Sequence, residues 1–306
     1  MGNWAGYALI RAFVGFVGLL PRLLAYPFCE ALAGVLFLMD GRHRHIGMVN
    51  LRIAFPEKDD DWRRRVLRRS FQEQGRHLVE ISRLERLTGE EVRRRIRYEP
   101  GRGLENYLRL RREGKSVLFL TAHISAWELL PLAHALHGHP LTFLVRPLDN
   151  PYLERWIIRL RTLGGNQVIS KTGSMRNVLR ALGDGRDVGF LIDQNSQEKE
   201  GVYVPFFGRL ASTNRSLAAL ALKTGAPVIA GFIYPDRKRG HYVIRFYPPV
   251  ELVSSGDQAR DVARGMALLN GYIEEVIREH PHCWLWGHRR FQTQPDGRDV
   301  YSIRKV

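Results

Sequence analysis

Short apolar runs alternate with amphipathic segments along the chain from residue 116 to residue 246. The apolar runs have the length of buried strands, and the segments between them have the periodicity of helices. Strands are predicted at residues 116–122, 141–145, 167–170, 188–192, 227–233 and 242–246, and helices at residues 125–137, 152–163, 174–182 and 213–224. This alternation predicts an α/β sandwich with a mixed, largely parallel sheet flanked by helices.

Charged helices precede the alternating region. Residues 59–86 are predicted to form a helix that opens with three aspartates, whose charge suits a helix N-terminus. A second charged helix is predicted at residues 89–97, and a short one follows Pro100 and ends near Arg112.

The N-terminal stretch, residues 4–39, is strongly apolar, but Arg11, Arg22 and Glu30 interrupt it. We interpret residues 1–40 as retained membrane-anchor helices, which either span the bilayer at a tilt over residues 4–20 or lie in its interface. A buried helical hairpin of a soluble domain is the alternative. If the stretch spans, the basic cluster at residues 42–45 places the following domain, residues 41–306, in the cytoplasm.

Composition adds a strong positive field to an otherwise ordinary globular chain. The 306 residues are 44% hydrophobic and 25% charged, with a formal net charge of +16. Such a charge attracts polyanions, namely nucleic acid, a phospholipid surface, a phosphorylated glycolipid or an acidic carrier protein. The only two cysteines, Cys29 and Cys283, fit no disulfide or metal-site spacing, which favours a reducing compartment.

His123 and Glu128 are the residues whose placement points to chemistry. His123 follows a predicted strand, at the edge where α/β sheets bind ligands, and Glu128 lies in the first turn of the next predicted helix. On one continuous helix two such residues would point about 140° apart, so only a strand-to-helix turn lets them meet. A carboxylate there holds the imidazole in the tautomer that takes a proton from a substrate hydroxyl, which activates an alcohol to attack a thioester.

Glu128 has an alternative role, because Ser125 and Glu128 also have the spacing of a helix capping box. Two groups of histidines, one at residues 134, 137 and 139 and one around residues 280–288, lack supporting ligands at an accepted metal spacing. The chain contains no phosphate-binding glycine loop and no serine nucleophile elbow. We therefore expect no metal and no acyl-enzyme serine.

The His-(four residues)-Glu segment after a strand resembles the signature of the lipid A biosynthesis late acyltransferase family, the lauroyl- and myristoyl-type enzymes. Five further segments resemble that family in the same order: residues 50–57, 145–151, 188–194, 204–208 and 286–291. The resemblance covers residues 5–295. It implies a glycerolipid-acyltransferase-like fold in residues 41–306, with His123 as general base and Glu128 as its charge-relay partner; related glycerolipid acyltransferases have aspartate at the position of Glu128.

Several arginines are candidate anion-binding groups. Arg146 follows the second strand, Asn150 is placed to orient that loop, and Arg159 and Arg161 lie in the next helix. A guanidinium suits a phosphate or a developing oxyanion, so these residues are candidates for the acceptor phosphates or the carrier phosphopantetheine. Surface charge is the alternative for each of them.

Asp193 and Gln194 end a predicted strand at the same sheet edge as His123. The resemblance implies that they line the mouth of the active site, although their residue types also suit a simple turn. Residues 213–215 are expected to open a helix, where an anion can bind or ordinary capping can occur.

The resemblance implies transfer of a fatty acyl chain to a hydroxyl of a lipid A precursor in lipopolysaccharide biosynthesis. The donor is an acyl thioester of acyl carrier protein or coenzyme A, no cofactor is expected, and the site is the cytoplasmic face of a bacterial inner membrane. An acyltransferase acting on glycerophosphate or another phosphoglycolipid would share the histidine–carboxylate chemistry. A basic nucleic-acid-binding protein remains the non-enzymatic alternative, although no recognised nucleic-acid module is present.

Overall fold

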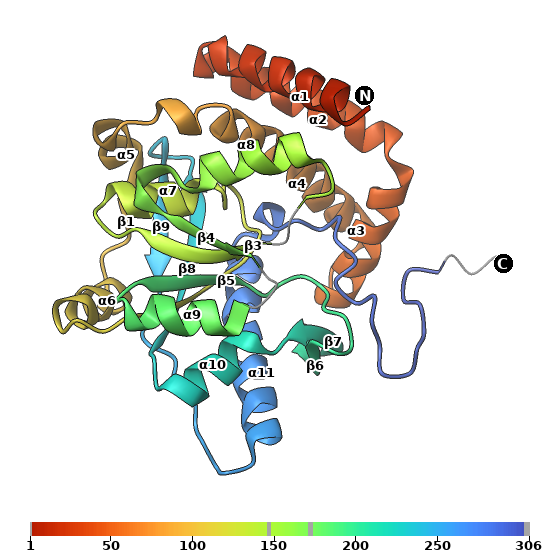
Figure 1. Cartoon of the computed structure of the whole chain (residues 1–306). Coiled ribbons are helices and arrows are strands. Elements are labelled where there is room, and N and C mark those ends of the chain that lie inside the picture. The colour runs from red at the N-terminus through yellow and green to blue at the C-terminus, as the bar shows by residue number, and fades with distance from the viewer. Residues whose placement is uncertain (1, 146–147, 171–173, 303–306) are drawn as a thin grey trace.

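A computed structural model describes residues 2–145, 148–170 and 174–302. Its centre is a seven-stranded sheet in the order β1-β9-β8-β2-β5-β3-β4, with helices on both faces (Figure 1). All neighbouring strands of this sheet are parallel except β8 and β9. The predicted mixed, largely parallel α/β architecture is therefore confirmed.

The strands are β1 (Ile96–Tyr98), β2 (Leu118–Thr121), β3 (Leu141–Val145), β4 (Gln167–Ser170), β5 (Asp187–Leu191), β8 (Val228–Asp236) and β9 (His241–Phe246), with β6 (Gly201–Phe206) and β7 (Arg209–Asn214) forming a separate antiparallel hairpin. The α-helices are α1 (Gly2–Leu19), α2 (Arg22–Met39), α3 (Gly41–Ala54), α4 (Asp60–Ile81), α5 (Gly89–Arg95), α6 (Arg102–Arg112), α7 (Leu129–Leu136), α8 (Pro151–Arg161), α9 (Ser174–Gly183), α10 (Ser216–Thr224) and α11 (Gln258–Glu279). Short 3-10 turns occur at Leu84–Arg86, Leu163–Gly165 and Pro281–Cys283.

Successive side chains of the buried strands face two different cores, as the pleat of a strand requires. On β2, Leu118 and Leu120 pack into one core with β5 and α11, whereas Phe119 packs into the other with α7 and α8. In Figure 1, α7 and α8 lie above the sheet, and α9 and α10 lie below it. Because these strands are buried on both faces, they appear in the sequence as continuous apolar runs.

All six predicted strands are present, with ends shifted by at most three residues. Three helix predictions need correction. Residues 96–98 pair with β9 as a strand instead of ending the helix at residues 89–97. Residues 213 and 214 end β7, so α10 begins only at Ser216, and α7 begins at Leu129 instead of residue 125. In both of the last two cases an extended segment or a turn delays the helix.

The N-terminal helices α1 and α2 form a hairpin that packs on α4 through Val17, Ala25, Cys29 and Val79. Each charge that interrupts this apolar stretch pairs with the rest of the protein. Arg11 lies over the ring of Trp156, 4.7 Å from its centroid, Arg22 lies 3.5 Å from Glu91, and Glu30 pairs with Arg76. The interruptions are therefore docking contacts.

The opposite side of the hairpin is apolar and exposed. Leu9, Leu19, Leu23, Leu38 and Met39 each expose 70% or more of their surface. Among the described residues, only α2 is long and apolar enough to cross a bilayer, and 17% of it is buried. The hairpin is thus less buried than a helical pair inside a soluble domain would be.

Gly75 permits the close approach of α2 to α4. A Cβ atom at this position would overlap the backbone carbonyl oxygen of Cys29 and lie 2.8 Å from its carbonyl carbon. Backbone atoms cannot move aside as a flexible side chain can, so the two helices would have to separate.

We predict that Gly75→Ala lowers the free energy of unfolding by about 1–3 kcal/mol, as overpacking does in other cores. The matched control is Gly271→Ala in α11, where a Cβ would meet no described atom within 4 Å. Because alanine favours a helix over glycine by about 1 kcal/mol, this control should be neutral or stabilising. Chemical denaturation of both variants measures the difference; equal stability would show that α2 does not depend on this approach.

Candidate active site

The parallel pairing of β2 with β5 brings His123 and Asp193 together. Thr121 at the end of β2 is in register with Leu191 at the end of β5. His123 and Asp193 each lie two residues beyond their strand, so they leave the sheet side by side at its carboxyl edge. That edge is where open α/β sheets bind ligands.

Asp193 fixes both the position and the tautomer of His123. Its Oδ1 lies 2.8 Å from Nδ1 of the imidazole, and its Oδ2 accepts from the backbone N–H of His123 at 2.9 Å. The indole N–H of Trp284 donates to the same Oδ2 at 2.8 Å. Because an ionised carboxylate only accepts hydrogen bonds, Nδ1 carries the proton and Nε2 is the free base.

Charge controls the protonation of this pair. Burial would raise the pKa of the Asp193 carboxyl, but His123 and three hydrogen bonds hold it well below its usual range. Burial would lower the pKa of His123, yet the Asp193 and Glu128 carboxylates outweigh that effect and raise it. Asp193 therefore stays ionised beside an imidazole of increased basicity.

A turn pinned by the C-terminal segment holds the backbone after His123. Ser125 has a φ of 51°, a left-handed conformation that is uncommon for a residue other than glycine. Its N–H donates to the carbonyl of Cys283 at 2.7 Å, and the N–H of Leu285 donates to the carbonyl of His123 at 3.2 Å. Contacts with residues 283–285 thus stabilise the turn that presents the imidazole.

Glu128 does not make the contact with His123 that the sequence predicted. Its carboxylate faces Arg161, whose Nε donates to Oε2 at 3.0 Å and whose Nη2 donates to Oε1. These bonds hold the pKa of Glu128 below its ordinary value although burial acts in the opposite direction. The carboxylate that contacts the His123 imidazole is therefore that of Asp193, and the prediction that Glu128 contacts this ring is wrong. Glu128 also makes no capping hydrogen bond at the start of α7, so the capping-box alternative is wrong as well.

The remaining candidates separate into distinct environments. Gln194 lies beside His123, with its Nε2 3.2 Å from Nε2 of the ring. Asn150 caps α8 by accepting from the N–H groups of Tyr152 and Leu153. Arg159 is exposed and lies 3.5 Å from Glu85, which fits the surface alternative. Arg146 lies outside the described residues.

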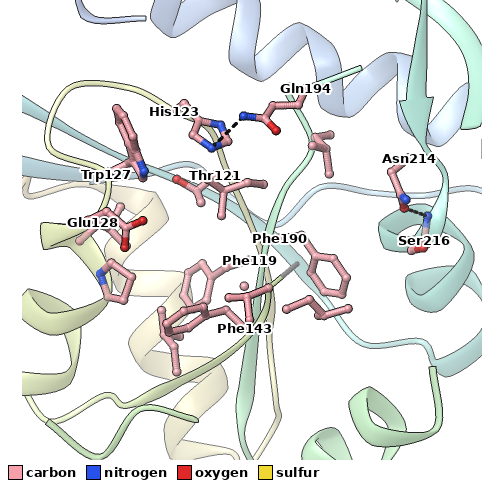
Figure 2. A pocket seen from close by; sticks show the side chains of 18 of the residues that line it. Phe119, Thr121, His123, Trp127, Glu128, Phe143, Phe190, Gln194, Asn214 and Ser216 are labelled. Carbon is pink, nitrogen blue, oxygen red and sulfur yellow. Dashed lines mark hydrogen bonds between the residues drawn. The ribbon is translucent and has the colours of Figure 1, made fainter. Parts of the chain in front are cut away.

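A cavity of about 780 Å³ opens beside His123. His123, Trp127, Glu128, Arg161 and Gln194 line its polar mouth. Its apolar wall comes from residues of β2, β3, β9 and α7, namely Phe119, Leu130, Leu141, Phe143 and Phe246. Figure 2 shows His123 and Gln194 at one end of the pocket and the rings of Phe119 and Phe143 at the other.

A chain of hydrogen bonds borders the apolar part of the cavity at His134. The hydroxyl of Tyr98 lies 2.6 Å from Nδ1 of His134, and Nε2 of the same ring lies 3.1 Å from the hydroxyl of Tyr107. Tyr107 donates to Asp187 at 3.0 Å, and Arg111 lies 3.1 Å from the same carboxylate. Burial holds the pKa of His134 well below its ordinary value, so the ring is neutral. This chain satisfies every polar group of His134 beside an apolar space.

Sequence reasoning missed several residues of the site. Trp127 contacts the edge of the His123 ring, with 5.1 Å between ring centroids, and stacks on His77 of α4 at 3.9 Å. Burial lowers the pKa of His77 to about 4. Trp284 and Arg290, from the C-terminal segment, support Asp193 and Gln194. The unusual density of tryptophan, histidine and arginine in residues 284–290 was the signal available for that segment.

Comparison with known proteins gives one family over nearly the whole chain. The model of the family described as bacterial lipid A biosynthesis acyltransferase matches residues 1–293. The chain is 26% identical to the lipid A biosynthesis palmitoleoyltransferase of Escherichia coli, over 98% of this chain and 92% of the relative. It is 27% identical to the lauroyltransferase and 21% identical to the myristoyltransferase of the same organism, over 96% and 98% of this chain and 92% and 93% of those relatives.

The match includes the His123 turn, the Asp193 loop and the C-terminal segment that supports both. The chain therefore belongs to the bacterial lipid A biosynthesis acyltransferase family.

Proposed function

We propose that this enzyme transfers a fatty acyl chain from a thioester donor to a hydroxyl of a lipid A precursor. The observation that carries the proposal is the imidazole of His123, whose Nδ1 is bonded to Asp193 and whose Nε2 faces a cavity with an apolar interior. A general base beside a space for hydrocarbon is what acyl transfer to an alcohol requires. The names of the relatives supply the acceptor class.

The transfer proceeds in one displacement. The acceptor hydroxyl gives its proton to Nε2 of His123 as its oxygen forms a bond to the thioester carbonyl carbon. The carbon–sulfur bond then breaks, and the imidazolium returns the proton to the leaving thiolate. Asp193 stabilises the imidazolium that forms in between, through the hydrogen bond to Nδ1. The only co-substrate needed is the acyl thioester.

Arg161 is the proposed binding group for a phosphate of the acceptor or for the negative charge that develops during the reaction. Glu128 holds the guanidinium through Nε and Nη2. Nη1 has no protein hydrogen bond within the described part of the chain, and Arg161 lines the cavity. A held guanidinium with free donors suits a phosphate of the glycolipid or the oxyanion of the intermediate. Glu128 therefore acts by positioning Arg161.

The acyl chain occupies the apolar part of the cavity. Phe119, Phe143 and Phe246 supply a wall without hydrogen-bonding demands, and His134 presents no unpaired polar group to it. The donor is an acyl carrier protein or coenzyme A thioester. The net charge of +16 favours the approach of either acidic carrier.

The exposed apolar face of the α1–α2 hairpin supports attachment of the enzyme to a bilayer, and the proposed site of action is the cytoplasmic face of the bacterial inner membrane. Arg11, Arg22 and Glu30 each contact a residue outside the hairpin, and the large side chains that the hairpin exposes are mostly apolar. Such a face binds the membrane interface in proportion to the apolar area it buries. A lipid-embedded acceptor would then meet an enzyme already at the surface.

Purified full-length protein should transfer an acyl group to a lipid A precursor, and His123→Ala should lower turnover by a factor on the order of 10²–10⁴, the usual contribution of a general base. Mass spectrometry of the product with lipid A precursor or glycerol 3-phosphate as acceptor identifies the class. A folded His123→Ala protein with full turnover would refute the role of the imidazole.

The pH dependence of kcat/KM should report the raised pKa of His123. Because the base must be neutral, the rate should rise with pH through a midpoint above about 6.5, the ordinary value for histidine. Asp193→Asn removes the largest effect that raises the pKa, so the midpoint should move to lower pH while the maximal rate falls. An unchanged midpoint in this variant would show that Asp193 does not act on the imidazole.

Polar substitution of the exposed hairpin face should weaken membrane binding. Leu23 and Leu38 are 84% and 70% exposed, and burial of a leucine side chain is worth about 1.5–3 kcal/mol. The double variant Leu23→Ser with Leu38→Ser should bind phospholipid vesicles at least about tenfold more weakly in a flotation assay. Leu268→Ser, at a 45% exposed leucine of α11, is the control. Equal losses in both proteins would place the membrane contact elsewhere.

A further inference from the structure

Gln194 covers the basic nitrogen of His123 in the structure. Its side-chain Nε2 lies 3.2 Å from Nε2 of the imidazole, as the dashed line in Figure 2 shows. Gln194 is exposed at the mouth of the cavity, directly after Asp193. The carboxylate and the amide of two consecutive residues thus occupy the two nitrogens of one ring.

The orientation of the Gln194 amide follows from the tautomer of His123. Nδ1 donates to the Asp193 carboxylate, which leaves Nε2 with a lone pair and no proton. Only the NH₂ end of the amide can face such a nitrogen. A neutral imidazole nitrogen has a single lone pair, and the acceptor hydroxyl must donate to that same lone pair before it reacts. The amide and the reacting hydroxyl are therefore mutually exclusive partners of Nε2.

The backbone of Gln194 is fixed while its side chain is free to leave. Arg290, which is fully buried, donates from Nη1 to the Gln194 carbonyl at 3.3 Å. The next N–H, of Asn195, donates to His288 at 2.9 Å. Within the described part of the chain, His123 is the sole hydrogen-bond partner of the Gln194 side chain. The amide can therefore swing away by rotation of the side chain alone.

We propose that Gln194 is a specificity residue that covers the catalytic base until the acceptor displaces it, and so disfavours transfer of the acyl group to water. This inference rests on the proposed role of His123 as general base. A glycolipid acceptor brings binding energy from its remote parts that offsets the lost hydrogen bond, whereas a water molecule brings none. With the amide in place, water cannot give its proton to Nε2, and the thioester is preserved.

The first test is hydrolysis of the acyl thioester by full-length enzyme without acceptor. In this reaction water gives a proton to Nε2 and its oxygen bonds to the carbonyl carbon. The carbon–sulfur bond breaks, the imidazolium returns the proton to the thiolate, and the thiol and fatty acid are released. Gln194→Met keeps the length of the side chain but removes the donor. We expect it to release thiol about 3–10 times faster than the unchanged enzyme, the factor for loss of one hydrogen bond. Gln292→Met, at an exposed glutamine outside the cavity, should leave the rate unchanged.

The second test needs no reaction and measures the titration of His123 by NMR of ¹⁵N-labelled histidine, assigned by the signal lost in His123→Gln. A donor to Nε2 favours the neutral ring and lowers its pKa. Gln194→Met should therefore raise the pH midpoint of His123 by about 0.5–1 unit, and Gln292→Met should not change it.

An unchanged midpoint, or hydrolysis by Gln194→Met that is no faster than that of the unchanged enzyme, would overturn the proposal. If Gln194 instead serves the reaction as a donor to the oxyanion, hydrolysis should fall, which also contradicts a covering role. Failure of the proposed function is seen separately, as absence of acyl transfer to a lipid A precursor by the unchanged enzyme, while the NMR titration still decides whether the amide covers Nε2.

Discussion

The hydrogen bond between Nδ1 of His123 and Oδ1 of Asp193 determines what the rest of the site can do. It fixes the proton on Nδ1, aims the lone pair of Nε2 into the cavity and increases the basicity of the ring. The bond exists because β2 and β5 are adjacent and parallel, with Thr121 and Leu191 in register. Packing of the C-terminal segment against both loops then keeps the geometry in place. The His123–Asp193 contact thus depends on sheet topology more than on any local motif.

The α1–α2 hairpin is connected to the cavity through helix α8. Arg11 of α1 lies over Trp156 of α8, and Tyr7 of α1 stacks on Tyr152 of the same helix with 5.8 Å between ring centroids. The same helix ends in Arg161, which pairs with Glu128 at the cavity mouth. One helix, α8, therefore contacts both the exposed hairpin and the candidate anion site.

Local patterns predicted most of the sheet and the position of His123, because apolar runs and helical periodicity depend on near neighbours. The partner of His123 could not be found in this way. Glu128 is close in sequence, but the turn at Ser125 directs it to Arg161, whereas Asp193 comes from a strand 70 residues away. Strand order decides that contact, and strand order is a non-local property. The β6–β7 hairpin was missed for a related reason, because its burial pattern is mixed and its partner strand supplies the pairing.

The most direct test of the account is a double-mutant cycle of kcat/KM between His123 and Asp193, with acyl thioester and lipid A precursor as substrates. If Asp193 acts only through the imidazole, Asp193→Ala should lower the rate strongly in the unchanged enzyme and cost nothing further in the His123→Ala background. If the factors by which the two single substitutions lower kcat/KM multiply in the double variant, His123 and Asp193 act independently, which would contradict the account.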